Sequence, residues 1–341
     1  MSQIYQKNSI FLWLVSSSLL LIVLIWVGGL TRLTGSGLSI TEWEIFSGIL
    51  PPLSELKWNE YFELYKKIPE YQKINFGMTL SEFKFIFWWE YIHRILARIL
   101  VLIYFVPLIY FLVKKKLRRS ESYYYSIIFI LFLLQGFMGW YMVKSGLLSV
   151  TDVSHYRLAA HLSLAIIIYS LIFWGLLNYE SKFKLNFAMP TILILCLVLL
   201  ILIQIIWGAF TSGLNAGLLY QTWPLMNEKF IADDIIIKNV LSVESFSNPS
   251  YVQLIHRLVA YFIIFYTIIV YIFYFRKINI IKPFKLIFAA IFIQVSLGIL
   301  TLISGLNIYL ASFHQIGSIF LISSTIYALF YINNYQNLID S

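Results

Sequence analysis

Four of the five histidines in this chain form two matched pairs whose residue type and spacing suit metal binding. His93 lies in the motif EYIHR, and His256 lies in the similar motif QLIHR much further along the chain. His161 and His314 follow, each near the start of a later apolar segment. A histidine within membrane-spanning sequence is costly and usually functional. Two histidines facing each other on neighbouring helices can be the axial ligands of a haem iron, so the sequence predicts two haem sites.

The same histidines allow plainer interpretations. Each could be an interfacial residue that hydrogen-bonds to water or to the backbone. Copper and zinc also bind imidazole, but two histidines without a third ligand make a poor zinc site. Because the four histidines recur in register with a sequence repeat, haem ligation is the interpretation we favour. The fifth histidine, His155, has no counterpart in the repeat and is predicted to be a solvated loop residue.

The two motifs differ at one residue that could do chemistry. Glu90 precedes His93 by three positions, and Gln253 stands at the matching position before His256. This spacing places Glu90 and His93 on the same face of a helix. A carboxylate at the edge of a haem could accept a proton during a reaction, so Glu90 is the candidate catalytic residue. The alternative is a structural ion pair with Arg94, which lies within reach one helical turn later.

An arginine directly follows the first histidine of each pair. These residues, Arg94 and Arg257, could bind the propionates of a haem, because a guanidinium matches a carboxylate with two hydrogen bonds. The alternative is that both extend to lipid phosphate at the membrane surface. Arg98 lies one turn beyond Arg94, and we expect it to be buried against a partner that the sequence does not name.

Composition identifies the chain as an integral membrane protein. Of its 341 residues, 60% are hydrophobic and only 12% are charged, whereas soluble domains carry about a quarter charged residues. The net charge of +9 could suggest a nucleic-acid partner. However, the basic residues cluster in short loops between apolar segments, as expected beside a membrane, so no nucleic-acid partner is predicted. The single cysteine, Cys196, excludes a disulfide within one chain.

The apolar segments are long enough to predict eight transmembrane helices, since a span needs about 20 apolar residues. The predicted spans are 10–30, 88–112, 123–143, 158–178, 188–209, 253–275, 285–304 and 311–332.

The basic loops predict the orientation of these spans. Lys and Arg cluster at 114–119, and further basic residues lie at 182–184 and 276–285. Cytoplasmic loops are rich in Lys and Arg, so these loops and both termini are predicted to be cytoplasmic. The long loops 31–87 and 210–252 would then face outward, and the aromatic residues of the first are expected to form interfacial helices. All four paired histidines would lie toward the outer, periplasmic face of a bacterial inner membrane.

The sequence pattern of spans one to four repeats in spans five to eight. Glycines end the first and fifth spans at matching places, and a Gln-x-x-x-Gly pattern recurs in the third and seventh spans, at Gln135 with Gly139 and at Gln294 with Gly298. The small residues would let a flat macrocycle or a neighbouring helix approach closely. The predicted fold is all-α, with two four-helix bundles related by a pseudo-two-fold axis. The expected domains are residues 1–180 and 181–341.

These motifs together resemble the haem A synthase family over nearly the whole chain, from Gly28 to about Ile332. The resemblance rests on EYIHR, on His256-Arg257, on His161 and His314, and on the segment GGLTRLTGSGLS that starts at Gly28. Members of this family oxidise the C8 methyl group of haem O to the formyl group of haem A, a cofactor of terminal oxidases. The resemblance implies an oxidoreductase.

The resemblance also implies a division of labour between the two halves. Haem O, the substrate, would bind in the first half between His93 and His161, beside Glu90. A resident haem b would bind in the second half between His256 and His314. Some family members carry a cysteine pair in an outer loop; this chain has none and resembles the subgroup without it.

The expected partners are haem O, a haem O synthase, an electron acceptor and membrane lipid. Two functions from other classes remain open from the residues alone. One is a dihaem b-type membrane electron carrier that oxidises a quinol, although placing all four histidines near one face disfavours it. The other is a transporter whose histidines relay protons.

Overall fold

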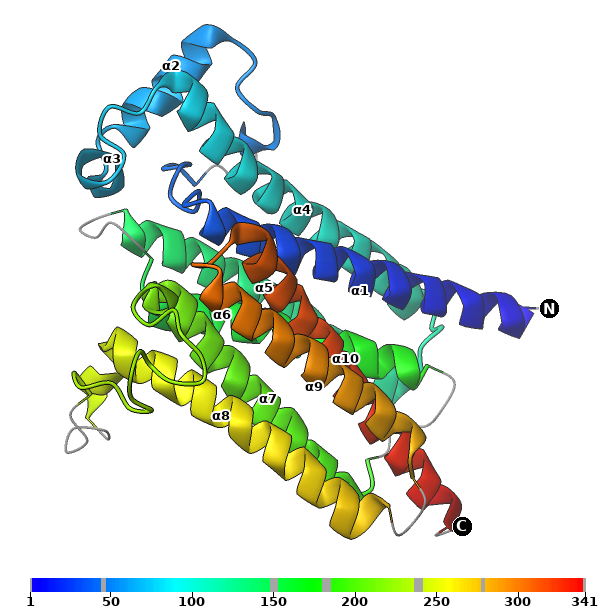
Figure 1. Ribbon diagram of the computed structural model, residues 1–341. Coiled ribbons are helices and arrows are strands. Elements are labelled where there is room, and N and C mark those ends of the chain that lie inside the picture. The colour runs from blue at the N-terminus through cyan, green and yellow to red at the C-terminus, as the bar shows by residue number, and fades with distance from the viewer. Residues whose placement is uncertain are drawn as a thin grey trace. The chain divides into compact units, whose positions relative to one another are not determined.

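The computed structural model describes residues 2–43, 47–147, 153–179, 185–235, 242–276 and 280–339, and these are helical apart from their connecting loops (Figure 1). Eight helices in this part are long and apolar enough to cross a membrane, which confirms the predicted spans. They are α1 (Ser2–Leu33), α4 (Leu80–Val113), α5 (Arg119–Gly146), α6 (His155–Leu177), α7 (Met189–Gly213), α8 (Pro249–Val270) with a π-helical extension at Tyr271–Phe275, α9 (Lys282–Ile303) and α10 (Ile308–Ile339).

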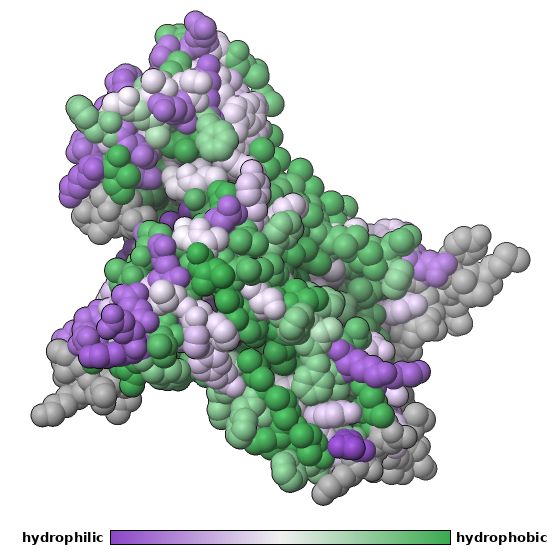
Figure 2. All heavy atoms as spheres, viewed as in Figure 1, coloured by the Kyte–Doolittle hydropathy of each residue, from purple (hydrophilic) through white to green (hydrophobic). Residues whose placement is uncertain are grey.

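The chain is therefore a multi-pass membrane protein. Hydrophobic residues cover the long helices, while hydrophilic residues gather at loops and helix ends (Figure 2). The predicted orientation of the helices stays a prediction. Three of the lysines that support it, Lys182, Lys184 and Lys277, lie outside the described residues.

Local sequence signals set the ends of the helices that carry the paired histidines. At the start of α4, Thr79 and Glu82 form a capping box, in which each side chain accepts from the other's backbone N–H. At the start of α8, the Asn248 side chain accepts from Tyr251 N at 3.0 Å, and Pro249 occupies the first turn. α4 begins eight residues earlier than the predicted span, so part of the expected outer loop is helix.

The first outer loop folds onto this early part of α4. It contains two short helices, α2 (Glu55–Tyr65) and α3 (Pro69–Lys73). The aromatic residues of α2 were expected at a membrane interface. Instead, Trp58, Phe62 and Tyr65 are buried, and the rings of Phe62 and Phe83 stack with centroids 5.0 Å apart. The loop is thus anchored by a small aromatic core on α4, because α4 extends far enough to provide the opposite wall.

The chain divides into two compact units. The first unit is residues 15–165, and the second is residues 1–14 with 166–341. Each contains one pair of histidines on long helices. Within the second unit, α7 packs against α8 and α10, and α9 packs against α10. The two four-helix bundles and their boundary at residue 180 stay predictions. Along the chain, the division between the two units falls within α1 and within α6, not in a loop.

Candidate functional site

Each compact unit brings the two histidines of one predicted pair together. In the second unit, the rings of His256 on α8 and His314 on α10 have centroids 6.4 Å apart and planes at 86°. Metal–imidazole bonds are about 2 Å long, so two rings that bind one ion from opposite sides have centroids about 6 Å apart. In the first unit, His93 on α4 and His161 on α6 lie within electrostatic range of each other. The ring separation in the second unit fits a bis-histidine haem.

Every one of these rings is seated on a glycine of the preceding long helix. A Cβ at Gly28 would lie 2.8 Å from Cε1 of His93, and a Cβ at Gly139 would lie 3.2 Å from Cε1 of His161. The second unit repeats this geometry, at 3.2 Å for Gly208 against His256 and 2.9 Å for Gly298 against His314. The glycines were expected to admit a macrocycle or a helix. The structure shows that they admit the imidazoles themselves.

Glutamines hold the backbone of three of the four histidines. The Nε2 amide of Gln135 donates to the carbonyl oxygen of His161 at 3.0 Å. Gln204 makes the same bond to His256, and Gln294 makes it to His314, both at 3.0 Å. The sequence interpretation overlooked Gln204. Its signal was present, because Gln204 stands four residues before Gly208, the spacing already noted at Gln135 and Gln294.

The two ring nitrogens have different surroundings: Nδ1 is buried in three of the histidines, and a glutamine amide lies beside Nε2 in two of them. The Nδ1 atoms of His93, His161 and His256 are buried, although each of these histidines is only partly buried as a residue. The Nδ1 atom of His314 lies 3.1 Å from the carbonyl oxygen of Gln294. A histidine that binds metal through one nitrogen commonly directs the other to a backbone carbonyl.

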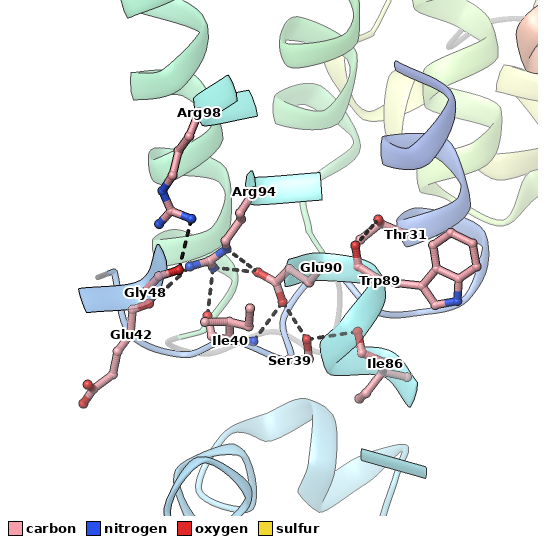
Figure 3. Close-up of polar contacts among 10 residues, drawn as sticks. All are labelled: Thr31, Ser39, Ile40, Glu42, Gly48, Ile86, Trp89, Glu90, Arg94 and Arg98. Atoms are coloured by element: carbon pink, nitrogen blue, oxygen red, sulfur yellow. Dashed lines mark hydrogen bonds and ion pairs between the residues drawn. The ribbon is translucent and has the colours of Figure 1, made fainter. Parts of the chain in front are cut away.

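Glu90 is a buried carboxylate with partners on both oxygens (Figure 3). Its Oε1 accepts from Arg94, at 2.6 Å from Nη2 and 3.1 Å from Nε. Its Oε2 accepts from the Ser39 hydroxyl at 2.7 Å and from Ile40 N at 2.8 Å. The ion pair that the sequence offered as the structural alternative for Glu90 is therefore present. Glu90 also ties the loop after α1 to α4.

Arg94 and Arg98 fasten the same loop to α4 through its carbonyl groups. Arg94 donates to Ile40 O at 2.9 Å and to Glu42 O at 3.2 Å, and Arg98 donates to Gly48 O at 3.2 Å (Figure 3). Gly48 is thus a partner that the sequence did not name for Arg98. The sequence could not predict this contact, because Gly48 lies 50 residues before Arg98 in the chain.

The second unit contains the counterpart of this arrangement without the charge. Gln253 Nε2 and Arg257 Nη2 both donate to the carbonyl oxygen of Tyr220, at 2.9 and 3.1 Å. Tyr220 follows the end of α7 by seven residues, as Ile40 follows the end of α1. Two buried polar atoms, Gln253 Oε1 and Arg257 Nε, have no hydrogen-bond partner. Buried polar groups are normally paired, so these atoms fit a site completed by a polar ligand group.

One further histidine, His155, lies in a different place from the one predicted. His155 was predicted to be a solvated loop residue. It is instead the first residue of α6, partly buried, with its ring centroid 4.0 Å from that of Tyr156. Within the described ranges, no group of three or more His, Cys, Asp or Glu side chains could hold a metal ion.

Comparisons with known proteins agree with this description. A family model described as cytochrome oxidase assembly protein, COX15-CtaA, matches residues 11–326. The chain is 50% identical to a protein of Pelagibacter ubique named heme A synthase, over 92% of this chain and 93% of the relative. It is 43% identical to a heme A synthase of Rickettsia africae, over 96% of this chain and 99% of the relative. A heme A synthase of Rickettsia conorii is 44% identical, over 96% and 99%.

Proposed function

The chain belongs to the COX15-CtaA family of cytochrome oxidase assembly proteins, and we propose that it acts as a haem A synthase. In this role it is an oxidoreductase that converts the C8 methyl group of haem O into the formyl group of haem A. The observation that carries the proposal is the pair of alike-seated histidine sites, of which only one has a buried carboxylate three residues before its first histidine.

The first unit is proposed to hold the substrate. His93 and His161 would bind the iron of haem O, and the glycine seats that they share with the second pair support this role. Oxidation of a methyl group removes protons as well as electrons, so the site needs a group that manages charge and protons. Glu90 is the candidate catalytic residue, because it is the carboxylate nearest in sequence to the first histidine. Arg94, paired with Glu90, is proposed to present its one remaining N–H group, on Nη1, to a propionate.

The second unit is proposed to hold a resident haem b between His256 and His314. When bound, such a haem supplies a one-electron carrier for the electrons that leave the substrate. The centroid separation of 6.4 Å supports two-sided ligation of one iron. The unpartnered Nε of Arg257 supports a propionate contact there, since a buried guanidinium N–H is costly to leave unpaired. Gln253 in place of a glutamate suits a site that binds but does not transform its haem.

The cellular setting follows from the same proposal. The protein would lie in a bacterial inner membrane with both termini cytoplasmic and both haem sites toward the periplasmic face. Haem O would come from a haem O synthase, and an electron acceptor would take up the electrons released. Membrane lipid would surround the apolar helices that Figure 2 shows.

Pigment analysis tests the function directly. The chain should be expressed together with a haem O synthase in cells that lack a haem A synthase, and the extracted haems should be separated by chromatography. The expected result is haem A, with only haem O in cells that carry an empty vector. A protein that binds haem and accepts electrons from a quinol, but leaves haem O unchanged, would instead be a dihaem electron carrier, and the proposed function would be overturned.

A further inference from the structure

The four histidine seats are alike except at one position. Three of them carry a glutamine four residues before the glycine on which the ring rests, and that glutamine donates to the backbone of the histidine. At the seat of His93, the residue four before Gly28 is Leu24. Leucine has a similar length to glutamine but no hydrogen-bonding group in its side chain. The exception falls in the unit proposed to hold the substrate.

Leu24 and Gln204 occupy equivalent places in three dimensions as well as in sequence. The ring of His93 rests on Gly28, and the ring of His256 rests on Gly208 in the same way. Both residues lie on the first long helix of their repeat, each four residues before its seating glycine. The two seats therefore share one backbone geometry, and the side chain at this position is what differs.

The glutamine side chain reaches the edge of the ring that would bind iron. Gln204 Nε2 lies 3.5 Å from Nε2 of His256, and Gln135 Nε2 lies 3.3 Å from Nε2 of His161. Each amide also donates to the carbonyl of the same histidine. Iron would displace the amide from the ring nitrogen, because both need the same lone pair, but the bond to the histidine carbonyl would remain and would hold the backbone that carries the ligand. Partners that orient a ligand in this way raise the affinity of the site for metal.

We propose that Leu24 makes His93 the releasable iron ligand of the first site, whereas Gln204 keeps His256 fixed in the second. This inference rests on the proposed function, in which haem O must enter and haem A must leave one site while haem b stays in the other. Gln135 fixes His161 in the first site, so the substrate would be held firmly from α6 and loosely from α4. Leu24 and Gln204 are positioning residues, because each acts through its histidine.

The test exchanges the two side chains and measures how fast haem leaves. Purified protein in detergent is loaded with haem b and mixed with an excess of an apo-globin, whose spectrum reports the haem it captures. In a His256→Ala background, which leaves only the first site, Leu24→Gln should slow haem loss about 10-fold. In a His93→Ala background, which leaves only the second site, Gln204→Leu should speed haem loss about 10-fold.

Methionine variants separate hydrogen bonding from side-chain shape. Leu24→Met should behave like Leu24, and Gln204→Met should behave like Gln204→Leu, because methionine matches the length of glutamine without its donor. Carbon monoxide binding to the reduced haem gives a second readout. It requires a ligand to leave the iron, so Leu24→Gln should reduce it and Leu24→Met should not. The Gln204 variants test the inference independently if Leu24→Gln does not fold.

Each outcome separates the inference from the proposed function. If the unsubstituted protein and both single-site backgrounds retain no haem at all, the proposed haem sites are wrong, and the inference falls with them. If they retain haem but Leu24→Gln and Gln204→Leu release it at the same rate as the single-site backgrounds from which they were made, the inference alone is overturned. Opposite shifts at the two sites, with the methionine variants following the apolar residue, would support it.

Discussion

Glu90 and Arg94 form a two-point ion pair across one turn of α4, and the same carboxylate holds the loop after α1. Arg94 contacts Oε1 through two nitrogens, while Ser39 and Ile40 N occupy Oε2. Four donors thus converge on one buried carboxylate. This arrangement gives Glu90 two roles to be separated by experiment. It could serve the oxidation directly, or it could act by positioning Arg94 and the loop.

Replacing Glu90 with glutamine should strongly reduce haem A formation. The change removes the charge at nearly constant size and makes the first motif resemble the second. Loss of a general base typically costs about a hundred- to ten-thousand-fold in rate. Extracted pigments should therefore contain haem O or a partly oxidised intermediate, while His93 and His161 still bind haem. Normal haem A formation would show that Glu90 is structural.

A Ser39→Ala variant distinguishes the two roles of Glu90. It removes one donor from Oε2 and leaves the carboxylate and its bond to Arg94 in place. If Glu90 acts directly, haem A formation should fall far less than in Glu90→Gln, because a single hydrogen bond is worth about 1 kcal/mol. Equal losses in the two variants, measured on protein with the same haem content, would assign Glu90 to loop positioning.

Gly139→Ala should lower haem binding at the first site, whereas Gly136→Ala should not. Both glycines lie on α5. A Cβ at Gly139 would approach the His161 ring at 3.2 Å, but one at Gly136 has nothing within 4 Å. Alanine favours a helix over glycine by about 1 kcal/mol, so neither change should weaken α5 itself. The haem content of each variant, purified in a His256→Ala background from cells that supply haem O, checks this, and equal losses would contradict the assigned role of Gly139.

Reporter fusions test the predicted orientation. Fusions after Lys116 and Lys282 should report cytoplasm, because these residues lie in or beside basic loops. Fusions near Lys66 and Asp234, in the two long loops, should report the outer side. A cytoplasmic signal near Lys66 would contradict the predicted orientation. It would mean that the loop that Glu90 holds, and the proposed haem sites with it, lie at the cytoplasmic face of the membrane.

The sequence predicted the features that depend on composition and periodicity. The eight spans follow from apolar length, and the pairing of the histidines follows from their place in the repeat. The Gln-x-x-x-Gly spacing was visible at Gln135 and Gln294, and the same spacing would have identified Gln204. The role of Gln204, a hydrogen bond to the backbone of His256, could not be predicted, because it depends on how far apart α7 and α8 lie.

Other contacts could not be predicted because they join distant parts of the chain. The bonds from Glu90 to Ser39 and Ile40, and from Arg98 to Gly48, depend on how the first outer loop returns along α4. No periodic signal in that loop specifies its path. The burial of Phe62 against Phe83 likewise depended on α4 starting earlier than its apolar core indicates. An aromatic-rich segment can cover a helix as readily as a membrane surface.

The haem content of histidine variants tests the central claim, that two unequal histidine pairs bind haem with a division of labour. Protein purified without a haem O supply should show the visible spectrum of a six-coordinate, low-spin haem b. His256→Ala and His314→Ala should each lose most of it, because each removes one of two ligands on opposite sides of the iron. His93→Ala should keep it. Full spectra in both His256→Ala and His314→Ala would contradict the cofactor assignment, and loss in His93→Ala alone would reverse the roles of the two sites.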